Sequence, residues 1–116
     1  MPHIHLETTS DLPENADVPD ILEALVAQLS VQESVSSASV KAYHSLRSVW
    51  AVGEGHRPGI AHCTVMILTG RSTELKAKIA DAMFETLRAQ FAASLDAEEV
   101  AVTLELREMA ADTYRK

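Results

Sequence analysis

The hydrophobic pattern changes between a period of two and a period of nearly four residues, so it predicts both strands and helices. Residues 2–7 (PHIHLE) alternate as a strand does, with Pro2 on the apolar face and two histidines on the polar face. Residues 60–68 (IAHCTVMIL) are apolar on both faces, which is typical of a central strand. Residues 99–107 (EVAVTLELR) alternate again. Residues 38–52 (ASVKAYHSLRSVWAV) favour one long strand because they hold valine and aromatic residues.

Two further stretches carry apolar residues at helical spacing. Residues 18–30 (VPDILEALVAQLS) have a single apolar stripe, which predicts an amphipathic helix. A second helix is predicted to begin within GRSTE (70–74), where Ser72 or Thr73 can cap its first turn. Its apolar stripe continues to about Leu95, so we expect one long helix over this segment.

The order of these elements is strand, helix, strand, repeated once, which predicts an α+β fold. The two β-α-β units cover about 2–52 and 60–107 of a single domain (1–116), with the turn-forming GEGHRPG (53–59) between them. A right-handed crossover joins parallel strands, so we expect a four-stranded mixed sheet with both helices on one face. Two helices leave the other face uncovered, and self-association would cover it.

Composition excludes several kinds of partner. The chain has 116 residues and a formal net charge of −7, and this acidic balance argues against nucleic acid as a partner. The sequence shows no apolar run of about 18 residues and no leader, so neither a membrane span nor secretion is expected. Cys63 is the only cysteine, which excludes an internal disulfide and favours the cytoplasm. Its apolar neighbours predict a small buried side chain.

The histidines raise the question of a metal site. The chain has five of them: His3, His5, His44, His56 and His62. His3 and His5 share one strand face, but no cysteine, aspartate or glutamate at matching spacing completes a site, so we expect no metal. We interpret His62 as a packed, hydrogen-bonded residue of the core or of an interface. For Trp50, a subunit interface and a pocket lining both remain open.

Pro2 has two interpretations. A proline cannot donate a backbone hydrogen bond, so it is tolerated at the first residue of an edge strand without any further role. If Met1 is removed, however, Pro2 becomes a free secondary amine, and such an amine can act as a base. The sequence around Pro2 leaves both interpretations open.

Three stretches, MPHIHLET, AHCTVMILTGRSTE and VAVTLELRE, resemble the 5-carboxymethyl-2-hydroxymuconate isomerase family of the tautomerase superfamily. The resemblance covers nearly the whole chain and matches it in the order and length of the elements. It implies a tautomerase-like duplicated β-α-β fold. It also implies a homotrimer in which the sheets face inward and the helices lie outside.

The resemblance implies an isomerase that shifts a double bond in an unsaturated hydroxy dicarboxylate, 5-carboxymethyl-2-hydroxymuconate, during aromatic catabolism. No cofactor is implied, and the partner is a small-molecule carboxylate. Pro2, after loss of Met1, would be the base that removes a proton from one carbon and returns it to another. Arg71 matches the family's arginine in Gly-Arg-Ser, and its planar fork suits a carboxylate.

The sequence departs from the family pattern after the first helix. Lys41 and Tyr43 stand where the family carries arginines, and lysine keeps the charge but not the planar fork. Arg47 could compensate, but its side chain shares a face with Lys41 only if no bulge intervenes. Two alternatives therefore remain, namely a tautomerase of another enol or keto acid and, if Met1 is retained, a non-catalytic trimeric binding protein.

Overall fold

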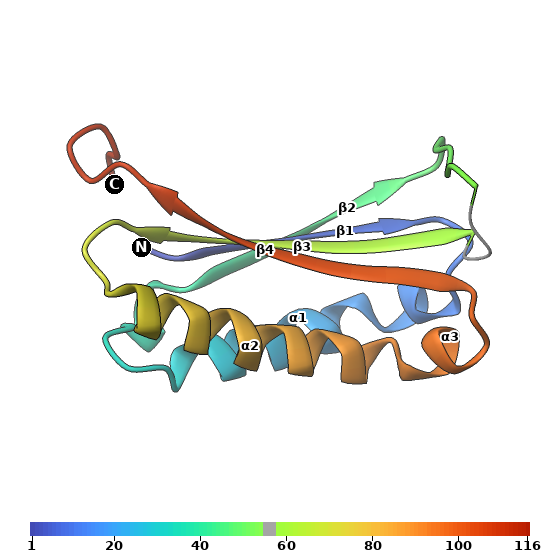
Figure 1. Cartoon of the computed structure of the whole chain (residues 1–116), viewed down its shortest axis with the longest axis horizontal. Coiled ribbons are helices and arrows are strands. Elements are labelled where there is room, and N and C mark those ends of the chain that lie inside the picture. The colour runs from blue at the N-terminus through green and yellow to red at the C-terminus, as the bar shows by residue number, and fades with distance from the viewer. Residues whose placement is uncertain (55–57) are drawn as a thin grey trace.

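A computed structural model describes residues 1–54 and 58–116, and its strands form a single mixed sheet (Figure 1). The strands are β1 (His3–Thr9), β2 (Lys41–Arg47), β3 (Gly59–Leu68) and β4 (Val100–Met109). Their order in the sheet is β2-β1-β3-β4. β1 and β2 are parallel, β3 and β4 are parallel, and β1 and β3 are antiparallel. The predicted four-stranded mixed sheet is confirmed, whereas the division into units at 2–52 and 60–107 stays a prediction.

The helices lie on one face of this sheet, as predicted, and leave the other face open (Figure 1). They are α1 (Val18–Ser30), α2 (Thr73–Gln90), α3 (Ala92–Asp96) and the short 3-10 helices η1 (Pro13–Asp17) and η2 (Ser37–Ser39). The side chain of Ser72 caps α2 by accepting a hydrogen bond from the Leu75 N–H, at 3.1 Å. None of the helices in the described ranges is long and apolar enough to cross a membrane.

The core lies between the sheet and the two long helices. Every second residue of β1 points into it, so Ile4 and Leu6 are fully buried, and Pro2 is buried at the end of the same row. From the helices, the fully or almost fully buried side chains are Ile21, Leu25 and Leu29 of α1 and Ile79, Met83 and Leu87 of α2. Each such side chain contributes about 1.5–3 kcal/mol by leaving water. This packing fixes the position of β1 and therefore of Pro2.

The single long strand predicted over 38–52 is wrong, because β2 covers only Lys41–Arg47. β2 is an edge strand whose one partner is β1, and β1 ends at Thr9, which is paired with Arg47. Beyond that point the chain has no strand to pair with. The predicted turn over 53–59 can be followed only in part, since residues 55–57, including His56, lie outside the described residues.

The second helix is also shorter than predicted. α2 ends at Gln90, and Phe91 takes up a non-helical conformation with φ −113° and ψ 23°. The Phe91 side chain is fully buried, so the chain turns where this ring enters the core. Leu95 belongs to the separate helix α3, which Glu14 holds in place through hydrogen bonds to the Ser94 N–H and hydroxyl.

Candidate active site

The end of the sheet at which β1 begins brings together Pro2, Lys41 and Arg71. Pro2 precedes β1, and its carbonyl oxygen accepts a hydrogen bond from the Lys41 N–H at 3.1 Å, which continues the parallel pairing of β1 and β2. Pro2 is buried and Met1 is half-buried, so the N-terminus lies against the protein. Two of the three predicted substrate-binding residues, Lys41 and Arg71, are therefore at the same end of the sheet as the predicted base.

The electrostatics at this end of the sheet disfavour a protonated amine. The pKa of the Met1 α-amino group is lowered, first by burial and then by the positive charges of Lys116, Arg71 and Lys41. While Met1 is attached, the Pro2 nitrogen is an amide and cannot act as a base. The same positive charges would act on the Pro2 amine once Met1 is removed, because Pro2 lies one residue further into the protein.

The Arg71 side chain is held in place by three hydrogen bonds. Its Nε donates to the Ser34 hydroxyl at 2.9 Å, its Nη2 to the Ser34 carbonyl at 3.0 Å, and its Nη1 to the Leu68 carbonyl at 3.2 Å. Gly70, with φ +123°, supplies the left-handed turn that directs the chain from β3 into Arg71. Among the described residues no carboxylate pairs with Arg71, so its charge is uncompensated. A guanidinium has five N–H donors, so two are left for a ligand.

Lys41 is exposed at the start of β2, directly across from His3 in the sheet. The His3 Nε2 is hydrogen-bonded to the Tyr114 hydroxyl at 2.8 Å, and the His3 ring lies edge-on to Tyr43 and Tyr114, with centroid distances of 6.1 and 6.0 Å. Burial, Lys41 and the N-terminal amine lower the pKa of His3, so its neutral form is favoured.

Two neighbours of this site, Tyr114 and Lys116, were not predicted from the sequence. Residues 108–116 (EMAADTYRK) have no clear hydrophobic period, so the sequence offered no pattern from which to place them. The hydrogen bond between Tyr114 and His3, which are 111 residues apart, shows that this segment returns to the beginning of the chain.

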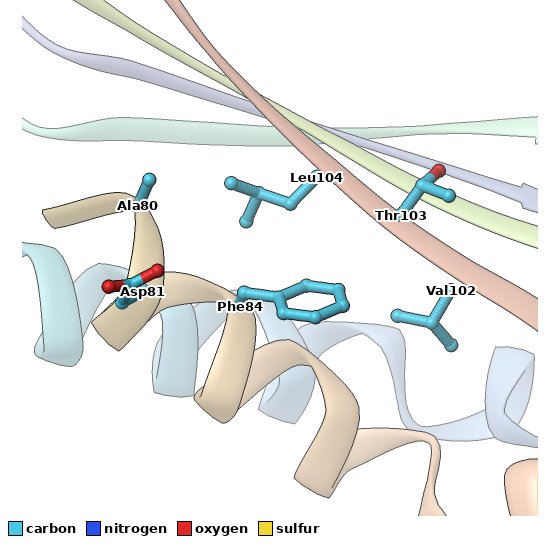
Figure 2. Close-up of a pocket in the computed structure, with 6 residues that line it drawn as sticks. All are labelled: Ala80, Asp81, Phe84, Val102, Thr103 and Leu104. Carbon is cyan, nitrogen blue, oxygen red and sulfur yellow. The ribbon is translucent and has the colours of Figure 1, made fainter. Parts of the chain in front are cut away.

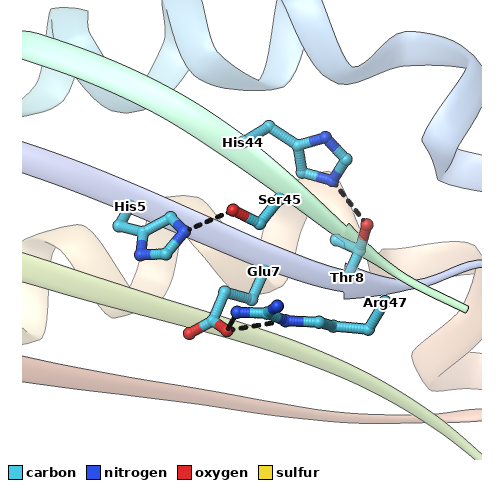
Figure 3. Close-up of polar contacts among 6 residues, drawn as sticks. All are labelled: His5, Glu7, Thr8, His44, Ser45 and Arg47. Carbon is cyan, nitrogen blue, oxygen red and sulfur yellow. Dashed lines mark hydrogen bonds and ion pairs between the residues drawn. The ribbon is translucent and has the colours of Figure 1, made fainter. Parts of the chain in front are cut away.

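Arg47 lies at the opposite end of β2. β2 pairs with β1 without a bulge, so Arg47 does share a face with Lys41, but six residues of strand separate them by about 20 Å. Arg47 instead binds Glu7, whose Oε2 accepts from Nε at 3.0 Å and from Nη2 at 2.6 Å (Figure 3). The Arg47 hydrogen bond holds the pKa of Glu7 below its usual range. Within one chain, the structure does not bring Arg47 to Pro2.

A cavity of about 180 Å³ lies beside the Glu7–Arg47 pair. Trp50 lines it and donates its indole N–H to the Pro58 carbonyl at 2.6 Å, so within this chain Trp50 is a pocket-lining residue. His62 lines the cavity from β3, and its Nδ1 is hydrogen-bonded to the Thr103 hydroxyl at 2.7 Å. The predicted hydrogen bonding of His62 is confirmed, whereas a core position is wrong, because His62 lies on the open face of the sheet.

A second hollow of about 320 Å³ lies between α2 and the edge strand β4 (Figure 2). Its lining consists of Ala80, Asp81, Phe84, Val102, Thr103 and Leu104. Among the described residues no basic side chain lines it, and the one charged group there is the Asp81 carboxylate. A carboxylate ligand would be repelled there, so this groove is less suited to a dicarboxylate than the end of the sheet that holds Pro2.

The remaining reactive groups are engaged in packing and hydrogen bonds. In the part of the chain that the structure describes, no group of three or more histidine, cysteine or acidic side chains could hold a metal ion. His5 is hydrogen-bonded to the Ser45 hydroxyl at 2.8 Å and His44 to the Thr8 hydroxyl at 2.7 Å (Figure 3). Cys63 is fully buried, as predicted, and burial raises the pKa of its thiol to about 12, so it is not available as a thiolate nucleophile.

Comparison with known proteins agrees with this architecture. A model of the 5-carboxymethyl-2-hydroxymuconate isomerase family matches residues 2–116. The chain is 26% identical to 5-carboxymethyl-2-hydroxymuconate Delta-isomerase of Escherichia coli over 94% of this chain and 87% of that protein. The crystal structure of a 5-carboxymethyl-2-hydroxymuconate isomerase from Deinococcus radiodurans R1 has a TM-score of 0.89, with 28% identity over 99% of this chain and 87% of that one. A fused 4-OT described as a symmetric trimer shares the fold, with a TM-score of 0.64 and 22% identity over 91% of this chain and 85% of that one. The chain therefore belongs to the 5-carboxymethyl-2-hydroxymuconate isomerase family.

Proposed function

We propose that this protein shifts a carbon–carbon double bond of 5-carboxymethyl-2-hydroxymuconate, or of a closely similar hydroxy dicarboxylate, with Pro2 as the proton carrier. Its family membership and its similarity to the isomerases of that name support this substrate. The observation that carries the proposal is the convergence of three cations, Lys41, Arg71 and Lys116, on the N-terminal amine of a chain whose net charge is −7.

Removal of Met1 would make Pro2 the N-terminal residue, and the small side chain of Pro2 favours that removal. Burial and the nearby cations would both favour the neutral form of this amine, because each disfavours the ammonium form. The neutral nitrogen takes a proton from a carbon next to the carbonyl or enol carbon. It then returns the proton to another carbon as the double bond moves, so the enzyme ends in its starting state.

The substrate carboxylates would be held by Arg71 and Lys41. Arg71 keeps two N–H donors after its three hydrogen bonds to the protein, and those bonds fix the direction of the fork before a ligand arrives. Lys41 is exposed and binds as a point charge. Any contact of Arg47 with this substrate requires a second chain, because Arg47 lies at the far end of β2 and is paired with Glu7.

A second candidate is a tautomerase of another enol or keto acid, such as a phenylpyruvate-like compound. Lys41 and Tyr43 favour it, because both stand where the resembled family carries arginines. A lysine and a tyrosine offer less bidentate recognition of carboxylates than two arginines. The reaction at Pro2 would be the same for both candidates, and only the substrate would differ.

We also propose that the protein is a homotrimer whose open sheet faces meet in the interior. None of the helices in the described part of the chain covers this face (Figure 1). Apolar side chains at its edge remain in water in the single chain, with Tyr43 42% and Val49 91% exposed. Association of the open faces would bury such groups. We further place the protein in the cytoplasm and in aromatic catabolism, on the basis of its lone cysteine and its proposed substrate.

Intact mass and turnover together test the proposal. The natively expressed protein should lack Met1, and it should isomerise the muconate in an absorbance assay. Pro2→Ala should lose about 100-fold or more, the usual contribution of a positioned base. Pro19→Ala, in the first turn of α1, is the matched control and should keep its activity. Retained Met1 together with no turnover would support a non-catalytic binding protein. A Pro2→Ala variant as fast as the wild type would refute Pro2 as the base, and activity only on phenylpyruvate enol would support the second candidate.

A further inference from the structure

The C-terminal segment, residues 110–116, folds back onto the end of the sheet that carries the N-terminus (Figure 1). A turn follows β4, in which the Tyr114 N–H donates to the Ala110 carbonyl at 3.0 Å. The turn directs the half-buried Tyr114 side chain toward β1, where its hydroxyl is hydrogen-bonded to the His3 Nε2 at 2.8 Å. The segment is therefore attached to the protein one residue away from Pro2.

Lys116 is within reach of Pro2 because of this attachment. Two residues of extended chain span at most about 7 Å, so the Lys116 backbone stays close to the His3–Tyr114 contact. His3 is the direct neighbour of Pro2 and lies across from Lys41 in the sheet. The effect on the N-terminal amine agrees with this placement, since Lys116 contributes to its lowered pKa ahead of Arg71 and Lys41.

A ligand with two carboxylates would explain why several basic side chains lie near the N-terminal amine. In a chain with 17 acidic and 10 basic residues, three basic side chains act on a single end of one sheet. Arg71 donates three of its N–H groups to the protein and therefore offers less to a ligand than a free arginine does. Lys41 offers one compact charge. Arg71 and Lys41 therefore leave part of a dianion without a partner, and a third cation would bind that part.

We propose that residues 110–116 form one wall of the candidate active site, in which Lys116 binds a carboxylate of the substrate and Tyr114 positions the segment through His3. This inference rests on the proposed function for the identity of the substrate. It adds to that function a residue that sets specificity for a second carboxylate.

The experiment compares Lys116→Gln, Lys116→Arg and Tyr114→Phe with the wild type in steady-state kinetics. For the dicarboxylate, Lys116→Gln should raise KM about fivefold to tenfold with little change in kcat, because a single hydrogen bond at an exposed position contributes about that factor. Lys116→Arg should restore KM, and a monocarboxylate enol should be insensitive to Lys116→Gln. Lys78→Gln removes the same charge from an exposed position on α2 and is the matched control.

The double variant Tyr114→Phe/Lys116→Gln shows whether Tyr114 acts through Lys116. If it does, Tyr114→Phe alone raises the same KM, and the double variant is no worse than Lys116→Gln. Additive effects, or a Tyr114→Phe variant that binds both substrates equally weakly, would contradict a positioning role.

A binding measurement separates this inference from the proposed function. Titration of the wild type with adipate, a saturated dicarboxylate, needs no turnover and should show binding about fivefold to tenfold tighter than to Lys116→Gln. Equal affinity of the two proteins, or no adipate binding at all, would overturn the role of Lys116 even if the enzyme is active. An inactive wild type that still binds adipate through Lys116 would overturn the proposed reaction and keep the binding site.

Discussion

Replacing Arg71 by lysine tests whether the planar guanidinium group of Arg71 stabilises the contact between the end of β3 and the segment that follows α1. The three Arg71 hydrogen bonds connect the end of β3 at Leu68 with Ser34, in the segment that follows α1. Ser34 has φ 67°, a left-handed conformation that costs a non-glycine residue about 1–2 kcal/mol. Two of the three bonds contact Ser34, so they stabilise the residue that carries this cost.

A lysine at position 71 can keep one of these bonds but cannot make three in one plane. Since a typical hydrogen bond contributes about 1 kcal/mol net, loss of two predicts a decrease in the free energy of unfolding of about 1–3 kcal/mol. Urea unfolding at equal protein concentration should show a midpoint lower by about 1 M, for a slope of about 2 kcal/mol per molar. Arg107→Lys, at an exposed position whose partner is Glu105, is the control and should change the midpoint little. An Arg71→Lys variant as stable as this control would refute the anchoring role of the fork.

Other predictions concern the core, the base and the response to acid. Glu14→Gln should lower the free energy of unfolding by about 1–3 kcal/mol, because the buried carboxylate accepts from both the Ser94 N–H and hydroxyl; an unchanged urea midpoint would contradict it. Lys41→Gln should move the rising limb of the pH profile of kcat/KM to higher pH, because Lys41 lowers the pKa of the N-terminal amine. A rising limb at the same pH would argue against an amine near Lys41 as the proton carrier. The pKa of His44 is lowered, first by burial and then by His5, so the unfolded state takes up the proton first and stability should fall as the pH drops below about 6.5. His44→Gln should reduce that fall in urea titrations between about pH 7 and 5, and an identical decline would exclude His44 as its source.

The elements that local sequence determines were predicted well. Burial alternates along β1 from His3 to Thr8, so the side that faces the core and the polar side both follow from residue order. The helix over 18–30 has the predicted bounds, and Ser72 caps α2 as expected, because both signals lie within a few residues. The resemblance to the isomerase family placed each candidate site residue on a predicted helix or strand. It could therefore assign Pro2, Lys41 and Arg71 to one site.

What sequence could not predict depends on contacts between distant segments. The end of β2 is set by the end of β1, which is 38 residues earlier in the chain at Thr9. The end of α2 depends on the entry of Phe91 into the core rather than on the helix propensity of its neighbours. The contact between Tyr114 and His3 joins residues 111 positions apart, and no pattern in the last residues indicates it.

If Pro2 is a free amine whose neutral form is favoured, ¹⁵N NMR of protein labelled at its four prolines will detect it. An amine nitrogen titrates with pH, whereas the amide nitrogens of the other three prolines do not. We expect one titrating proline signal, which should be absent in Pro2→Ala. Its pKa should be below that of the amine in the unstructured peptide PHIHLE, because burial and nearby cations disfavour protonation. The absence of a titrating proline signal would show that Pro2 is not a free amine. A pKa equal to or above that of the peptide would show that its neutral form is not favoured.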